Sequence, residues 1–538
     1  MNPVSDIQAL QQTLRARVQV KDWVGAATTL RQMLTLQPGN AELLIQLSYM
    51  ESGAGNYRAA GEAIVEAANR PPRHPEALGD LMARLRTFNE AEVLGRLIEQ
   101  IGPIERIPIP LLIQAGAQWS YLNEQTRALR LLDEAKRGDP DYPPTLLART
   151  QVLTYLGRID DAQADVDRAL RRAPQIAQAH WLCSRLRKQT SESNHVAQIR
   201  QELQRPNRSS RDVSLLAFAL HKELDDLGDH AGAWSALEQG CRAKRATLPY
   251  QREASHRLVE GLMRLPAGSG EVVAADAAPP TPIFIVGMHR SGTSLLEQLL
   301  SGHDAVLATG ELYDFTCAMR YGTNHHCRGV IDQGIVDRAG QIDFVDVGQR
   351  YLDGVAWRLG DRRLFSDKLP SNFLNIGFIC QALPQAKILH LVRDPMETCF
   401  SNLRELFSDA NAYSYDMAEL ADYFLQYRRL MKHWHATFPG RILDVRYDAL
   451  TGDTESVMRE VATFCGLDYV PGMADPDSNR RAIATASAMQ VRGGVVRRRE
   501  PKWWPYRQYL APLGEALRAA GIAYATPDAV VPGEASAG

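Results

Sequence analysis

A repeat of 34 residues in the first half of the chain is the strongest constraint on the fold. Prolines recur on one 34-residue grid, with a single gap at Arg106, and small residues recur at two fixed distances before them. A period of this length is typical of stacked helical hairpins, because small residues let two helices approach closely and proline cannot continue a helix. The prolines are Pro38, Pro72, Pro140 and Pro174; the alanines are Ala26, Ala60, Ala128 and Ala162 twelve residues earlier, and Ala67, Ala135 and Ala169 five residues earlier.

The pattern resembles the tetratricopeptide repeat over about residues 7–176, and a further hairpin is predicted at 215–245. The unit at 75–108 fits only with a small slip. The resemblance implies a superhelix with a concave face. That face has two candidate uses: binding a peptide or protein partner, or packing, either against the second half of the chain or in a dimer. The repeats are assigned to residues 1–260.

The pattern changes after a segment rich in Gly, Ala and Pro. Residues 265–282 are predicted to be a linker, residues 282–525 a second domain, and residues 526–538 a flexible tail. The second domain alternates short apolar runs with helical periodicity, which is typical of a parallel α/β sheet. The predicted fold class is α plus α/β: a helical repeat superhelix followed by a P-loop-like domain. A cut in 265–282 is predicted to leave a C-terminal piece that binds nucleotide.

The segment IFIVGMHRSGTSLLEQLL begins the second domain and predicts a phosphate site. Gly287 and Gly292 have the spacing of P-loop glycines between a buried strand and a helix start, so backbone N–H groups and the helix dipole point at one anion. Thr293 stands where a nucleotide kinase has its lysine, and the strong cation is Arg290. The loop therefore favours a phosphate other than a magnesium-bound triphosphate.

Five segments in order resemble sulfotransferases, most closely tyrosylprotein sulfotransferases and their bacterial kin. They are MHRSGTS, SDKLPSNF, KILHLVRDPMETCFSNL, RYDAL and the stretch 485–506. The resemblance covers about residues 281–515. It implies transfer of a sulfuryl group from 3′-phosphoadenosine 5′-phosphosulfate to a hydroxyl acceptor, protein tyrosine being one candidate, without a metal.

The resemblance also implies a role for each matched residue. The loop grips the 5′-phosphate, Arg393 and Ser401 grip the 3′-phosphate, Lys368 stabilises the transition state, and Ser487 lies near the sulfuryl group. Physical reasoning alone supports the second grip, because an arginine at a strand end and a hydroxyl on the next helix can meet one dianion. The alternative for Arg393 is a capped turn in which it pairs with Asp394. The predicted donor-binding residues are Arg290, Ser291, Gly292, Thr293, Ser294, Arg393, Ser401, Tyr447 and Lys502, and the predicted catalytic residues are Glu311, Lys368, Arg290 and Ser487.

The general base is predicted to be Glu311, which follows Arg290 by 21 residues and resembles the family's glutamate segment. His303 and Asp314 are the alternatives. The sequence departs from the family in having His289 where proline is usual. It also has Glu405, with Arg404 beside it, where a second cation is usual.

Composition limits the other classes of function. The 61 Lys and Arg residues nearly balance the 63 Asp and Glu residues, which argues against a general nucleic-acid surface. The 7 cysteines have neither disulfide nor metal spacing, and no signal pattern or membrane-length apolar run is found, so the expected compartment is the cytoplasm. His325, His326 and Cys327 form one short group for which a loop is favoured over a metal site. Two rival functions stay open: a P-loop nucleotide kinase or NTPase, and an inactive repeat scaffold.

Overall fold

A computed structural model describes residues 3–266, 280–477, 481–485 and 500–526. The predicted linker and tail lie largely outside these residues, as does Ser487. The described chain forms two compact units, Met1–Pro140 with Leu312–Asp361 and Gln381–Leu383, and Asp141–Glu311 with Arg362–Cys380 and Pro384–Gly538. This grouping differs from the boundaries in the sequence: each unit holds part of the repeats and part of the second half. The sequence boundaries therefore stay a prediction.

The predicted helical hairpins are confirmed in both units. The alanines at the repeat positions are fully buried, and the helices end just before the grid prolines. In the first unit the repeat helices are α1 (Pro3–Gln19), α2 (Trp23–Leu36), α3 (Ala41–Gly53), α4 (Tyr57–Asn69), α5 (Pro75–Thr87), α6 (Ala91–Gln100), α7 (Ile109–Tyr121) and α8 (Gln125–Gly138). In the second unit they are α9 (Pro143–Leu156), α10 (Ile159–Arg172), α11 (Ala177–Leu186), α12 (Val196–Leu203), α13 (Ser210–Asp226), α14 (His230–Arg245) and α15 (Arg252–Met263).

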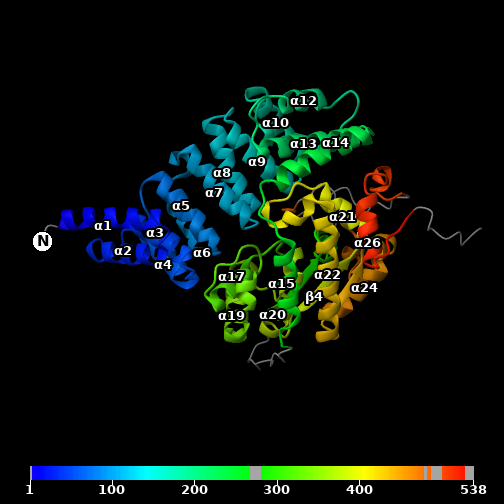
Figure 1. The fold of residues 1–538 in the computed structure, drawn as a ribbon. Coiled ribbons are helices and arrows are strands. Elements are labelled where there is room, and N and C mark those ends of the chain that lie inside the picture. Colours follow the sequence, from blue (N-terminus) through cyan, green and yellow to red (C-terminus); the bar gives the residue numbers. More distant parts are fainter. Residues whose placement is uncertain (1–2, 267–279, 478–480, 486–499, 527–538) are drawn as a thin grey trace, which may run out of the picture. The chain divides into compact units, whose positions relative to one another are not determined.

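The predicted hairpin at 215–245 is α13 and α14, which lie side by side (Figure 1). Each helix has a side-chain N-cap, Ser209 and Asp229 respectively. A Cβ on Gly240 would lie 2.8 Å from the ring of Phe218, so glycine permits the close approach of the two helices.

The second unit contains a five-stranded, wholly parallel sheet in the order β2-β3-β1-β4-β5. The strands are β1 (Thr281–Gly287), β2 (Val306–Ala308), β3 (Leu364–Asp367), β4 (Lys387–Val392) and β5 (Ile442–Arg446). One face packs on α16 (Thr293–Leu300) and α24 (Thr454–Cys465) through a buried apolar cluster that includes Ile285, Leu391 and Val445. The other helices of this half in the same unit are α21 (Pro395–Leu403), α22 (Met417–Thr437), α23 (Tyr447–Gly452) and α26 (Ala511–Ala519).

Part of the second half belongs to the first unit with the early repeats. Helices α17 (Asp314–Thr323) and α19 (Phe344–Leu359) pack on each other, and α17 also contacts α4 (Figure 1). The short α18 (Gln333–Val336) lies between them in sequence, and α20 (Ile376–Ala382) follows β3. Within the described residues, no helix is long and apolar enough to cross a membrane.

The last repeat hairpin packs closely on the α/β half within the second unit. The ring of Trp234 on α14 stacks on Tyr509 at 5.0 Å between centroids, and Arg245 pairs with Glu419 at 2.7 Å. Phe218 on α13 meets Tyr415 edge to face. These contacts bury apolar surface from both halves of the chain, so part of the repeat region shares a core with the sheet domain.

Candidate active site

Most of the predicted site residues that the structure describes lie at one edge of the parallel sheet. Each of the five strands is followed at its carboxyl end by one predicted element of the site, as expected of open α/β folds. Strand β1 leads into the loop 287–292, and the others lead to Glu311, Lys368, Arg393 and Tyr447 in the order β2, β3, β4 and β5. Residues far apart in sequence therefore lie together at the carboxyl edge of the sheet.

The loop between β1 and α16 needs both of its glycines. Gly287 has φ +150°, and a Cβ there would lie 2.8 Å from the Leu391 carbonyl oxygen. Gly292 has φ +114°, and a Cβ there would lie 2.5 Å from the ring of Tyr447. Tyr447 therefore packs directly on the loop, and the backbone conformation that presents the N–H groups of α16 excludes a side chain at either position.

Arg290 is the buried cation of the loop and has a left-handed backbone, with φ 65°. Its side chain is 6% exposed and pairs with Glu405 at 3.5 Å. Its Nε donates to Ser401 Oγ at 3.4 Å, which brings the loop next to the predicted 3′-phosphate serine. Burial lowers the pKa of Arg290; Glu405 opposes that shift, whereas the nearby guanidinium groups of Arg185, Arg393 and Arg404 add to it.

Arg393 lies beside the loop at the end of β4. It donates to the Arg290 carbonyl at 3.1 Å, pairs with Glu397 at 2.6 Å, and its guanidinium lies over the ring of Tyr447 at 4.5 Å. The carboxylate that Arg393 pairs with is thus Glu397, whereas Asp394, the alternative partner, caps α21. Glu397 also accepts a hydrogen bond from the backbone N–H of Lys502, which holds the C-terminal segment next to Arg393.

Glu311 and Lys368 form the centre of the site. Lys368 Nζ lies 2.7 Å from Glu311 Oε1; the lysine side chain is fully buried, whereas the glutamate is 34% exposed. The Lys368 backbone N–H donates to the Gly310 carbonyl, so the ends of β2 and β3 hold the pair together. An accessible carboxylate beside a buried ammonium can accept a proton from an acceptor hydroxyl while the ammonium offsets developing negative charge.

The two alternative bases are not part of this pair. The sheet register pairs Val306 with Leu364 and Leu364 with Thr281, so His303, three residues before Val306, lies at the amino end of the sheet, opposite the loop. Its Nδ1 accepts a turn hydrogen bond from the Ala305 backbone N–H. Asp314 belongs to the first compact unit, where it is buried and accepts a hydrogen bond from Asn89; burial raises its pKa.

Glu297 on α16 supports the centre and was missed by sequence analysis. It is 1% exposed, and its Oε1 accepts from the Gly310 N–H at 2.9 Å and from Ser366 Oγ at 2.8 Å. Arg481 pairs with its other oxygen at 2.7 Å. Burial alone would raise the pKa of Glu297, but Arg481, Lys368 and Ser366 outweigh it and hold the pKa below its usual value. Glu297 thus orients the backbone next to Glu311.

The polar atoms of the loop fit a bound phosphate group. Ser291 is 1% exposed, and its Oγ has no hydrogen-bond partner among the described residues. Thr293 and Ser294 begin α16, where N–H groups lack intrahelical acceptors, and Ser294 Oγ lies 3.2 Å from Thr485 Oγ1. With the glycine cradle and the buried arginine, these groups could together hold one phosphate dianion.

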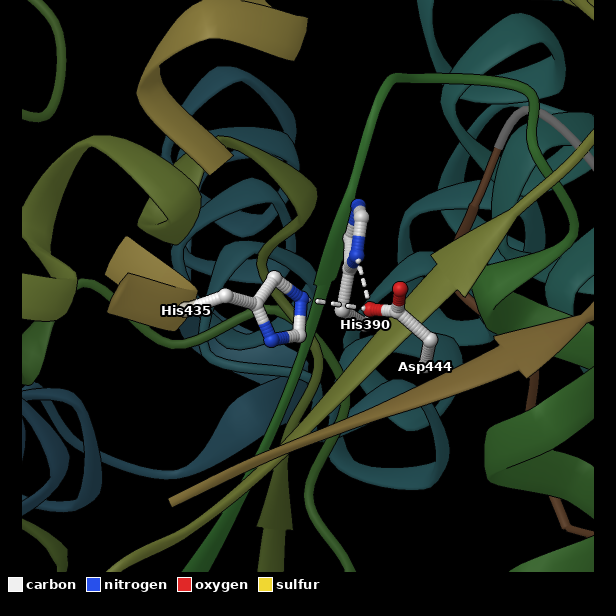
Figure 2. A group of neighbouring side chains, drawn as sticks. All are labelled: His390, His435 and Asp444. Atoms are coloured by element: carbon white, nitrogen blue, oxygen red, sulfur yellow. Dashed lines mark hydrogen bonds and ion pairs between the residues drawn. The ribbon is translucent and has the colours of Figure 1, made fainter. Parts of the chain in front are cut away.

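A separate group of side chains on β4, α22 and β5 has the residue types of a metal site. Asp444 Oδ1 accepts from His390 Nδ1 at 2.7 Å and from His435 Nε2 at 2.8 Å (Figure 2). The Nε2 atom of His390 accepts from the Tyr427 hydroxyl. Burial lowers the pKa of His390. These hydrogen bonds join the three side chains to one another and to Tyr427. At the group predicted to be a loop, His325 pairs with Asp332 and Cys327 accepts from Arg320.

Comparisons with known sequences agree with the predicted family. The model of the sulfotransferase family matches residues 282–471. The chain is 28% identical over 413 residues to an uncharacterized protein of Aquifex aeolicus (74% of this chain, 53% of the relative). It is 22% identical over 231 residues to a putative protein-tyrosine sulfotransferase of Caenorhabditis briggsae (41% and 80%). The chain thus spans about half the length of the Aquifex relative. The family match places a sulfotransferase-family domain after the N-terminal helical repeats, as the sequence predicted.

Solved structures similar to parts of the chain are of two kinds. One is the sulfotransferase domain of the Synechococcus PCC 7002 olefin synthase, with 22% identity, TM-score 0.29, and coverage of 41% of this chain and 86% of that chain. Another is a thermophilic tetratricopeptide protein of Thermus thermophilus, with 21% identity, TM-score 0.20, and coverage of 39% of this chain and 98% of that chain.

Proposed function

We propose that this protein is a sulfotransferase that moves a sulfuryl group from 3′-phosphoadenosine 5′-phosphosulfate to a hydroxyl acceptor. The observation that carries the proposal is the Glu311–Lys368 pair at 2.7 Å, at the same sheet edge as the loop with Arg290. A base, a charge-stabilising cation and a phosphate cradle are the three groups that sulfuryl transfer requires.

The residues divide the work as follows. The loop N–H groups, Thr293 and Ser294 hold the 5′-phosphate, and Arg393 with Ser401 holds the 3′-phosphate. Glu311 accepts the proton of the acceptor hydroxyl while the hydroxyl oxygen forms a bond to sulfur. The bond from sulfur to the phosphate oxygen breaks, and Lys368 and Arg290 offset the charge left on the bisphosphate. No step requires a metal, since the cations are supplied by side chains.

We propose tyrosine in a peptide as the first acceptor to test. Two things support it: the name of the Caenorhabditis relative, and the helical repeats, a fold whose concave surface suits an extended partner. We also propose that a protein partner binds the repeats and that the protein is located in the cytoplasm.

The test is a transfer assay with a ³⁵S-labelled donor, tyrosine peptides and a cell lysate, paired with a melting assay. The proposal expects 3′,5′-adenosine bisphosphate to raise the melting temperature and label to reach a hydroxyl acceptor. If ATP with magnesium stabilises the protein and the bisphosphate does not, the function is instead that of a nucleotide kinase or NTPase. Nucleotide binding without any labelled product would indicate an inactive scaffold.

A further inference from the structure

A cavity of about 630 Å³ in the second unit is lined by both the repeats and the sulfotransferase domain. Helix α11 contributes Trp181 and Arg185, and the domain contributes Arg290, Ser401 and Lys502. Ligand cavities of small molecules and cofactors have this order of size. Because three of these residues belong to the predicted donor site, the repeat helix borders the same cavity as that predicted site.

At position 405 the chain has a glutamate, whereas the family resemblance leads us to expect a second cation there. Glu405 is 6% exposed, and Arg185 Nη1 lies 2.5 Å from its Oε1. Its other oxygen lies 3.5 Å from Arg290. The repeat helix thus supplies a cation at the position where the domain's own sequence lacks one. Arg185 is 28% exposed at the cavity and lies over the ring of Trp181, so it is held in place.

The charge around Arg290 points to an anionic ligand. Three other guanidinium groups, those of Arg185, Arg393 and Arg404, act on Arg290, against the carboxylate of Glu405. Arg404 is itself paired with Asp225 on α13 at 2.5 Å. Arg393 is paired with Glu397, so the four guanidinium groups face three carboxylates, those of Glu405, Glu397 and Asp225. A bound phosphate dianion would offset the positive charge that remains.

We propose that Arg185 of the repeat helix α11 is a donor-binding residue that recognises the 3′-phosphate end of the nucleotide, so that the repeats form part of the nucleotide site. The inference rests on the proposed function. It assigns the repeats a role beyond partner binding: the sulfotransferase domain obtains one of its phosphate contacts from a helix about 220 residues away in sequence. The competing explanation is that Arg185 only fastens α11 to Glu405.

The test measures the affinity of the full-length chain for 3′,5′-adenosine bisphosphate and for 5′-AMP by calorimetry. Loss of one charge-assisted contact weakens binding roughly ten- to hundredfold. Arg185→Ala is therefore expected to weaken the bisphosphate by about that factor and 5′-AMP by less than about twofold. The control is Arg168→Ala, which breaks an exposed pair with Asp141 on the repeats and should leave both affinities unchanged.

A second variant separates the two explanations. In Arg185→Ala the buried Glu405 loses a partner, so part of any defect could come from an uncompensated carboxylate. The double variant Arg185→Ala/Glu405→Gln removes that carboxylate. If Arg185 contacts the phosphate, the double variant stays at least about tenfold weaker than Glu405→Gln alone. Recovery to the affinity of Glu405→Gln alone would mean that Arg185 only fastens the helix, and would overturn the inference.

The remaining outcomes are also decisive. If the wild type binds the bisphosphate and Arg185→Ala binds it equally well, or loses 5′-AMP to the same extent, the inference fails and the proposed function stands. If the wild type binds neither nucleotide, the proposed function fails, and this inference fails with it.

Discussion

The two ends of the candidate site are built differently. At the reaction end, Glu311 and Lys368 come from two neighbouring strand ends of one sheet, and a backbone hydrogen bond from Lys368 to Gly310 joins those ends. At the nucleotide end, Arg290 and Ser401 face a cavity that is also lined by α11 and α13 of the repeats. Sheet register is enough to position the first pair, whereas the second group depends on packing between two kinds of fold.

The largest effect is expected when the sulfotransferase domain is produced without the repeats. Residues 280–538 would expose the surfaces that Trp234, Phe218 and Arg245 cover in the full chain. We expect this fragment to lose cooperative unfolding and measurable binding of the bisphosphate, in contrast to the separability that composition suggested. Circular dichroism melting and calorimetry test this.

The control for the fragment is co-expression of residues 1–266 with residues 280–538, which is expected to restore binding. A fragment 280–538 that melts cooperatively and binds like the full chain would mean that the nucleotide end needs nothing from the repeats.

Glu311→Gln tests the reaction end. Glutamine keeps the size and a hydrogen bond to Lys368 but cannot take the acceptor proton, so transfer should fall about 10²–10⁴-fold. The affinity for the bisphosphate should change less than about twofold, because Glu311 makes no phosphate contact in this mechanism. Single-turnover transfer and calorimetry measure the two effects separately.

The matched control for that variant is Asp304→Asn, an exposed carboxylate at the amino end of the sheet, which should leave transfer unchanged. His303→Ala should also leave it unchanged. Near-normal transfer by Glu311→Gln together with loss of transfer in His303→Ala would show that the base is the histidine.

A buried histidine near the nucleotide end predicts a pH dependence of stability. Burial is the main cause that lowers the pKa of His221 to about 4, and the positive charge of Arg404 is the second cause. The Nδ1 atom of His221 donates to the Ala233 carbonyl. Because the pKa is lowered in the folded state, its contribution is complete above about pH 6.5 and is lost as pH falls toward 4. The loss in the free energy of unfolding should reach about 3 kcal/mol.

The variant His221→Asn keeps a donor for Ala233 but does not titrate. Denaturant unfolding at pH 7.5 and pH 4.5 should therefore depend less on pH in the variant than in the wild type. The exposed His74→Asn serves as the control and should retain the wild-type dependence. An unchanged pH dependence in His221→Asn would mean that other groups cause it.

Arg393→Ala has the smallest expected effect and tests which residues contact the 3′-phosphate at the nucleotide end. It removes one charge-assisted contact of about 1.5–3 kcal/mol, so the bisphosphate should bind roughly ten- to hundredfold more weakly. Binding of 5′-AMP should be spared, because that ligand lacks the 3′-phosphate. Equal losses for the two ligands in calorimetry would remove Arg393 from the 3′-phosphate site.

Much of the reaction end could be predicted from sequence. The two glycines of the loop, Lys368 after β3 and Glu311 after β2 follow from local spacing, because parallel strands deliver their carboxyl ends to one edge. Glu297 could not be found in this way. It occupies an apolar-looking helix, and nothing local shows that its carboxylate accepts from Gly310 and Ser366.

The sequence by itself determined the repeat hairpins, the glycine loop after β1 and the order of the strand-end residues. These depend on near neighbours in the chain: helical periodicity, backbone conformation at glycine, and strand ends. Only the tertiary structure decided that Asp314 lies in a different compact unit from Glu311, and that Arg185 is the partner of Glu405. Such choices depend on which surfaces bury each other, because a buried charge takes the partner that packing brings to it, at whatever distance along the chain.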